Sequence, residues 1–273
     1  MLYLERHPHP TLAPFIKTFW YACDPHATHR HERVLPNGRA QIVISLARDY
    51  LTDANHPIDP LQHTPAALFL GLYSHHQQID TIDLTELIGV LFHPGGTLAF
   101  FPDNTHLFTN RETSLEGIWG RAAANLRNDL REAPTPARKF DLLDFALRHR
   151  LSESTTTHRT PTIDYVLTQL HRSPGTITIA QLTRDMGIGP RRLSQLFRDH
   201  VGVSPKLYCR IQRFQQAVQH MHRGDDIHWA ELALTCGYYD QSHFINDFHA
   251  FSGLSPTHYS STQRRWSNHV PLD

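Results

Sequence analysis

Two clusters of hydrogen-bonding side chains have the residue types that read base edges in DNA. Arginine can bond guanine through two hydrogen bonds, and glutamine or asparagine can bond adenine in the same way. Each cluster falls on the polar side of a predicted helix, although any one member could instead be merely solvated. For His243, packing as a neutral imidazole beside Phe244 is an open alternative, and Arg192 suits a phosphate. The predicted DNA-binding residues are Arg191, Arg192, Ser194, Gln195, Arg198, Gln241, Ser242, His243 and Asn246.

The histidines are the second group that could do chemistry, since the chain has 22 of them. The densest cluster comprises Cys23, His26, His29 and His31, and His75-His76 is another. A zinc site needs three or four ligands converging on one point. The first cluster lies in a predicted loop with no second ligand pair at a recognisable spacing. We therefore predict solvated surface histidines and no metal, while binding by segment 26–31 stays an open alternative.

Sequence motifs of common enzymes are missing. The chain has no Gly-x-Ser-x-Gly elbow, no P-loop and no dinucleotide fingerprint. We therefore predict that the protein is not an enzyme and uses no cofactor.

The segment that carries the base-reading clusters contains an internal repeat of two copies. Residues 202–208 (GVSPKLY) recur as residues 253–259 (GLSPTHY), an offset of 51, and upstream the offset falls to 50. Each copy has the pattern of a helix, a glycine turn and a second helix. This pattern is typical of a DNA-reading helix-turn-helix, with an ordinary duplicated helical bundle as the alternative.

Helix signals place these units more closely. Thr178 to Gln181 is a predicted capping box, and Asp240 is the predicted cap of the later recognition helix. Between the copies, an apolar stripe predicts a helix over about 206–222, roughly 25 Å long at 1.5 Å per residue. Such a helix could hold the recognition helices about one DNA turn, ~34 Å, apart.

The C-terminal motifs resemble those of AraC/XylS-type transcriptional regulators. The run from Gly237 to Phe244 (GYYDQSHF), followed by Phe248 and the second repeat, carries the resemblance over about 100 residues. It implies a double helix-turn-helix that binds DNA. The chain departs from the family pattern at Gln195 and Asn246, where arginine is common. Fewer cations weaken phosphate attraction, so we expect modest affinity from a monomer.

The N-terminal half is rich in short β-strand patterns. Apolar runs at 15–23, 40–47, 66–73 and 86–92 are separated by turn signals, and a predicted capping box at Thr113 to Glu116 begins a helical region. Motifs such as residues 89–96 (GVLFHPGG) resemble sensor domains on one branch of the same family. The strand pattern alone suggests a small barrel or a sandwich, and the resemblance implies a small β-barrel with helices. The predicted fold is α+β: a small, cupin-like β-barrel with two helices over 1–151, a linker at 152–161, and an all-α double helix-turn-helix over 162–266.

Composition agrees with a cytoplasmic DNA-binding protein. Residues 170–266 carry 11 lysines and arginines against 7 acidic residues, and the rest of the chain carries 15 against 19. Three scattered cysteines, no signal peptide and no run of about 20 apolar residues predict a reducing cytoplasm and no membrane.

We therefore expect a sequence-specific transcription regulator that binds double-stranded promoter DNA. The resemblance implies a small-molecule effector in the N-terminal domain, with pocket residues unknown; Phe15, Phe19, Trp20 and Phe92 more often form simple core. It leaves open a contact with RNA polymerase and a homodimer. The alternative is a metal-sensing or protein-interaction module with weak, non-specific DNA binding.

Overall fold

The N-terminal half is built on an antiparallel sheet. The computed structural model describes residues 2–25, 29–51, 64–101, 104–154, 160–172, 177–223, 227–262 and 264–272. Six strands pair in the order β1-β2-β9-β4-β7-β10. Their bounds are β1 Leu2–Arg6, β2 Ile16–Cys23, β9 Leu87–Phe92, β4 Gln41–Ser45, β7 Ala67–Leu70 and β10 Glu112–Ser114.

The fold class is confirmed, but the predicted barrel is not closed. In the part of the chain that the structure describes, β1 and β10 are the two edges of the large sheet, and the remaining strands form separate small sheets. One has the order β11-β3-β8, with β11 His269–Pro271, β3 His31–Val34 and β8 Gln77–Asp80. The other pairs β5 Tyr50–Leu51 with β6 Thr64–Pro65.

Short 3₁₀ helices and three α-helices complete this half. The 3₁₀ helices are η1 Thr81–Thr85, η2 Thr97–Ala99 and η3 Thr105–Phe108, and the α-helices are α1 Leu115–Trp119, α2 Arg121–Glu132 and α3 Pro136–Glu153. The predicted capping box at residues 113–116 is wrong, because Ser114 caps α1 by accepting from the Gly117 N–H. A positive φ of 59° at Gly120 then separates α1 from α2.

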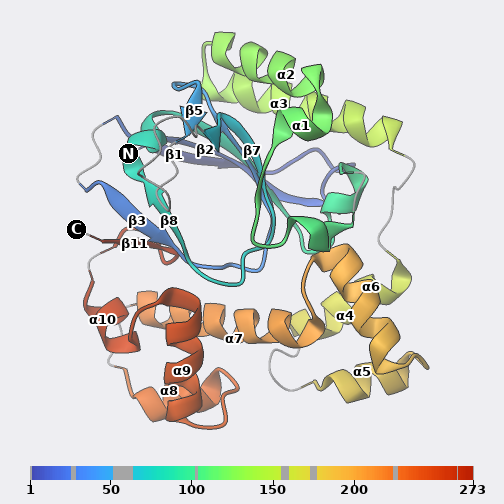
Figure 1. Cartoon of the computed structure of the whole chain (residues 1–273), viewed down its shortest axis with the longest axis vertical. Coiled ribbons are helices and arrows are strands. Elements are labelled where there is room, and N and C mark those ends of the chain that lie inside the picture. Colours follow the sequence, from blue (N-terminus) through green and yellow to red (C-terminus); the bar gives the residue numbers. More distant parts are fainter. Residues whose placement is uncertain are drawn as a thin grey trace.

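Aromatic and aliphatic side chains fill the space between the sheet and these helices. Phe15, Phe19 and Phe92 are at most 7% exposed and belong to this core, together with Leu143 and Leu147 of α3. In Figure 1, α2 and α3 lie across the top of the sheet. These three phenylalanines therefore pack as core side chains, which was the preferred interpretation of the sequence. Trp20, named with them, is half-buried and packs against a separate small cluster instead.

The C-terminal half is helical, as predicted. Its helices are α4 Pro161–Arg172, α5 Ile179–Asp185, α6 Pro190–Val201, α7 Pro205–His222, α8 Trp229–Thr235, α9 Gln241–Ser252 and α10 Pro256–Ser261. Of the predicted linker, residues 155–159 lie outside the described residues, as do residues 173–175, where the sequence predicts the end of α4. Helix α7 runs beneath the sheet, with α4–α6 at one end and α8–α10 at the other (Figure 1).

Two side chains of the N-terminal half join the hydrophobic core of the C-terminal helices. Leu35 and Leu72 from the N-terminal half pack with Ile211 and Phe214 of α7. The chain also returns after α10, because β11 pairs with β3 and buries Val270 in the same core. The sequence analysis placed no strand there.

Candidate DNA-binding surface

The two helix-turn-helix units have nearly the same geometry. Helices α6 and α9 are both 12 residues long and are related by the offset of 51. The turn before each contains a glycine with positive φ, Gly187 at 62° and Gly237 at 79°, and the second turn is one residue longer. Each helix ends at a left-handed glycine, Gly202 or Gly253. The repeat seen in the sequence is therefore a structural repeat.

Local hydrogen bonds fix where these helices begin. The predicted capping box at the start of α5 is present, with Thr178 and Gln181 bonding each other's backbone N–H. Asp240 caps α9 by accepting from the His243 N–H at 2.7 Å, whereas α6 begins at Gly189 without a side-chain cap. Both recognition helices therefore start where the sequence predicts.

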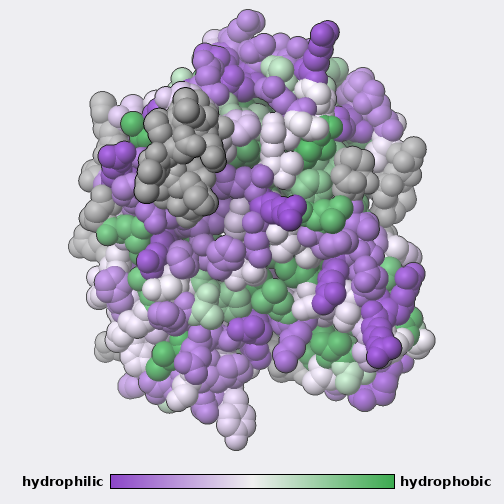
Figure 2. All heavy atoms as spheres, in the orientation of Figure 1, coloured by the Kyte–Doolittle hydropathy of each residue, from purple (hydrophilic) through white to green (hydrophobic). Residues whose placement is uncertain are grey.

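Most of the predicted base-reading side chains face solvent. In α6, Arg191, Arg192, Gln195 and Arg198 are exposed and Ser194 is half-buried. In α9, Gln241, Ser242 and Asn246 are exposed and His243 is half-buried. The opposite side of each helix is apolar and buried, through Leu193 and Phe197 or Phe244 and Phe248. Hydrophilic residues, purple in Figure 2, predominate over both helical units at the bottom of the molecule.

The two recognition helices differ in charge. Helix α6 contains three arginines, whereas α9 contains neither arginine nor lysine and has a buried aspartate, Asp247. Phosphate attraction comes mainly from cationic side chains. The first unit is therefore better suited to binding the DNA backbone than the second.

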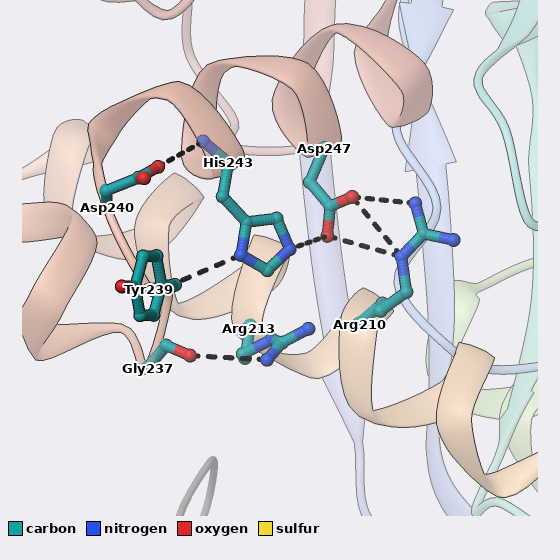
Figure 3. Close-up of polar contacts among 7 residues, drawn as sticks. All are labelled: Arg210, Arg213, Gly237, Tyr239, Asp240, His243 and Asp247. Carbon is teal, nitrogen blue, oxygen red and sulfur yellow. Dashed lines mark hydrogen bonds and ion pairs between the residues drawn. The ribbon is translucent and has the colours of Figure 1, made fainter.

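Asp247 anchors α9 to the central helix. Its carboxylate accepts three hydrogen bonds from the Arg210 guanidinium of α7, at 2.7, 3.2 and 3.3 Å (Figure 3). These hydrogen bonds raise the pKa of Arg210. The sequence analysis missed this pair. The sequence feature that could have indicated it is a carboxylate next to the apolar side of α9, because a buried charge needs a partner.

His243 is held within the same network. Its Nδ1 accepts from the Tyr239 N–H at 3.5 Å, and its Nε2 lies 3.9 Å from Asp247 Oδ2 (Figure 3). The ring also packs edge-to-face with that of Tyr238, at 5.3 Å between centroids. Both ring nitrogens thus have neighbours inside the domain, which favours the packing role for His243 over base reading.

The turn before α9 is fixed to α7 as well. Arg213 donates to the Gly237 carbonyl at 3.2 Å (Figure 3). Its guanidinium also lies over the ring of Tyr238. Burial, with a smaller contribution from Asp247, raises the pKa of the Tyr238 phenol. Burial also raises the pKa of the nearby Cys236 thiol to about 11. Both groups stay neutral at physiological pH, as an interior position requires.

Three further exposed residues of the second unit are not among the predicted DNA-binding residues. Tyr239, directly before the cap of α9, is 86% exposed. Ile245 and His249 are exposed on α9 at the positions that match Ser194 and Arg198 of α6. Applying the offset of 51 residue by residue would have found the last two.

The N-terminal half contacts the end of each recognition helix. Thr105 and Thr109 donate to the carbonyls of His200 and Gly202 at the end of α6, at 3.1 and 2.7 Å. Arg33 of β3 donates to the carbonyls of Ser252 and Gly253 at the end of α9. Terminal helix carbonyls lack intrahelical partners, so these donors satisfy them.

The central helix is tied to the same half and to the C-terminal strand. Gln215 of α7 donates at 2.8 Å both to the Pro36 carbonyl and to Asn268 Oδ1. Nearby, Glu32 of β3 contacts His29 at 2.6 Å and His269 of β11 at 2.8 Å. Burial opposes the charge on Glu32, but the hydrogen bonds and charges of the two histidines outweigh it and lower the pKa of this carboxyl.

The structure offers no support for a metal site in the histidine-rich segment. Among the described residues, no three histidine, cysteine or acidic side chains converge as ligands, and His26 lies outside those residues. No helix in the described ranges is both long enough and apolar enough to cross a bilayer.

Comparison with known families gives two separate matches. Residues 182–262 match a helix-turn-helix domain, and residues 4–114 match a domain of unknown function, DUF6597. No curated protein matches. The helix-turn-helix match defines the chain as a DNA-binding transcription regulator. The duplicated unit within residues 182–262 is a helix-turn-helix domain of the AraC type.

Three solved structures are similar to parts or most of the chain. ToxT from Vibrio cholerae O395 is 12% identical over 88% of this chain and 92% of its own, with a TM-score of 0.41. A DNA-binding transcriptional dual regulator from Escherichia coli K-12 is 24% identical over 38% of this chain and 95% of its own, with a TM-score of 0.31. A Listeria innocua protein of unknown function is 24% identical over 37% and 96%, with a TM-score of 0.33. At these TM-scores we draw no conclusion from them.

Proposed function

We propose that the protein is a sequence-specific transcription regulator whose helices α6 and α9 read two neighbouring major-groove segments. The observation that supports this proposal is the pair of equivalent 12-residue helices with exposed polar sides, joined by α7. At 1.5 Å per residue, the 18 residues of α7 span about 27 Å, which suits recognition helices one turn of DNA apart.

The proposed division of work follows the charges. In α6, Arg191 and Gln195 read bases, with Ser194 and Arg198 beside them, and Arg192 holds a phosphate. In α9, Gln241, Ser242 and Asn246 read bases, and His243 positions the helix start. Base contacts add specificity, while phosphate contacts set register and salt dependence.

DNA binding by the full chain tests this proposal. A duplex is selected from a pool of randomised duplexes, and its dissociation constant is compared with that of a scrambled duplex at several salt concentrations. We expect tighter, salt-dependent binding to the selected duplex, and loss of that preference in the Arg191→Ala/Gln195→Ala double variant. Arg138→Ala, which removes an exposed arginine of α3, is the control. Equal affinity for both duplexes would instead favour a protein-interaction module.

We further propose that a small molecule bound by the N-terminal half controls DNA binding. The contacts of Thr105, Thr109 and Arg33 with the ends of α6 and α9 support this, because they connect that half to both recognition helices. A ligand changes DNA affinity only if it binds two arrangements unequally, and the coupling is reciprocal. Small aromatic and apolar compounds are therefore screened by thermal denaturation of the full chain. A true effector must change the dissociation constant of DNA by some factor, and DNA must change the dissociation constant of the effector by the same factor.

Low cationic charge on α9 also supports a homodimer as the form that binds DNA. Sedimentation of the protein with and without the selected duplex tests this. A single copy on the duplex at saturating protein would exclude it. A contact with RNA polymerase is proposed on the family resemblance alone, and transcription in vitro from a template carrying the selected sequence tests it.

A further inference from the structure

One base-reading side chain is already held by a neighbour. Gln195 is exposed on α6, and its Nε2 donates to Oδ1 of Asp199, one helical turn later, at 2.8 Å. Residues four apart lie side by side on a helix. Asp199 is therefore placed to influence how Gln195 meets DNA without facing the same base itself.

The chemistry of this contact fixes which way the carboxamide points. A carboxylate only accepts hydrogen bonds, so it must face the NH₂ group of Gln195 and not its carbonyl oxygen. The NH₂ group has two hydrogens and gives one to Asp199. The second hydrogen and Oε1 remain available. One donor and one acceptor are what the major-groove edge of adenine requires. The contact therefore excludes the flipped carboxamide without consuming the groups that read the base.

Asp199 is in turn held from the N-terminal half. Nδ1 of His106 in η3 lies 3.3 Å from Asp199 Oδ1, within ion-pair distance. The position of η3 is fixed on both sides of His106, since Thr105 and Thr109 bond the end of α6. Packing is also tight there, because a Cβ at Gly202 would lie 2.8 Å from Thr109 Oγ1.

The second recognition helix lacks this device. With the offset of 51, Asn246 occupies the position of Gln195, and Ala250 occupies that of Asp199. Alanine offers no side-chain acceptor. The restraint is therefore specific to the first unit and does not follow from the repeat itself.

We infer that Asp199 is a specificity-determining positioning residue, which orients Gln195 for reading adenine, and that His106 extends this control to the N-terminal half. The inference rests on the proposed function, since it assumes that Gln195 reads a base. In this arrangement the side chains of His106 and Asp199 connect η3 to the base contact made by Gln195.

The test compares discrimination at single base pairs in the full-length protein. The selected duplex is altered at each position in turn, and the position that loses discrimination in Gln195→Ala identifies the base pair concerned. At that position we expect Asp199→Ala to lose about 10-fold in discrimination, part of the 1–3 kcal/mol of a bidentate contact. Affinity for scrambled DNA should stay unchanged or rise, because a negative charge is removed. In the Gln195→Ala background, Asp199→Ala should have no further effect.

Two further variants separate orientation from charge. Asp185→Ala removes an exposed carboxylate from α5 of the same unit and should leave discrimination unchanged. Asp199→Asn still offers an acceptor but also a donor, so it tolerates the flipped carboxamide and should lose less than Asp199→Ala. His106→Ala should weaken discrimination at the same base pair only.

The outcomes distinguish this inference from the proposed function. Equal binding of selected and scrambled DNA by the wild type overturns the regulator itself. Selective binding that Asp199→Ala leaves intact, or that it weakens equally at all positions, overturns the role of Asp199. Unchanged discrimination in His106→Ala overturns the path from η3.

Discussion

The ion pair between Arg210 and Asp247 gives a prediction whose size can be worked from its geometry. The Asp247 side chain is 7% exposed and accepts all three hydrogen bonds from a guanidinium that is 35% exposed. Removing one partner of a buried pair costs about 3–5 kcal/mol, because the other charge is left unpaired. Because position 210 is partly exposed, water can reach the unpaired carboxylate and offsets part of this cost. For Arg210→Met we expect a loss of about 2–3 kcal/mol.

Replacing Asp247, alone or together with Arg210, should lower the free energy of unfolding by less. Asp247→Leu leaves Arg210 unpaired, but a guanidinium with one third of its surface in water is readily hydrated. The double variant Arg210→Met/Asp247→Leu leaves no buried charge, and apolar replacement of a buried pair is often neutral. We therefore expect Arg210→Met to be the least stable of the three. The loss of stability in this variant should be confined to α9, which the ion pair attaches to α7.

Hydrogen exchange followed by mass spectrometry resolves where the loss falls. If α9 opens locally, a loss of about 2–3 kcal/mol raises exchange of its amides on the order of 100-fold, and α6 serves as the internal control. Equal acceleration in α6 and α9 would show that the pair is not a local anchor. A double variant as unstable as Arg210→Met would show that an unpaired carboxylate is not the cause.

The remaining predictions concern other contacts. Gly202→Ala should lower the free energy of unfolding by about 2 kcal/mol or more, because it combines a φ of 100° with a Cβ 2.8 Å from the hydroxyl of Thr109, directly after η3. Gly187→Ala has positive φ in open space, and an equal loss of melting temperature there would refute the crowding argument. Arg192→Ala should reduce the salt slope of DNA binding by about 0.9, whereas Gln241→Ala should weaken binding without changing that slope. Glu32 has a lowered pKa, so its stabilising contribution is present above the ordinary glutamate pKa and lost as pH falls through the lower folded value. In urea denaturation from about pH 5 to about pH 3, Glu32→Gln should therefore flatten the decline of the wild type, and an unchanged decline would contradict this.

The helical half was largely predictable because its signals are local. The capping box at Thr178 and the cap at Asp240 each depend on residues within one turn of each other. The repeat is found by comparing two stretches of the sequence directly, with no knowledge of which residues touch in space. The pair of Arg210 and Asp247 joins residues 37 positions apart. No local pattern relates such residues, although a carboxylate beside buried phenylalanines does indicate that a partner exists.

The N-terminal half was harder to predict because strand pairing is not local. Apolar runs gave the central strands β2, β4, β7 and β9, which are mostly buried. The more polar β3 and β8, and β11 at the opposite end of the chain, have no such run. Whether the sheet closes depends on its edges β1 and β10, and neither carries a sequence signal for closure. The strand pattern left a barrel and a sandwich both open, and the resemblance favoured the barrel.

The contacts between the halves constrain how any effector could act. The end of α6 is held by η3, the end of α9 by β3, and α7 by the segment around Pro36. A rigid shift of the whole N-terminal half would disturb all three contacts and cost several hydrogen bonds. Of these three contacts, movement of η3 with the adjoining Thr109 would disturb only the one with α6, through two threonine hydrogen bonds and His106. Because α6 also carries all the arginines of the two recognition helices, the smaller movement would act on the helix that contributes most to DNA affinity. We therefore expect variants at Thr105 and Thr109, more than variants at Arg33, to change DNA affinity, and parallel titrations of these variants with the selected duplex measure the difference.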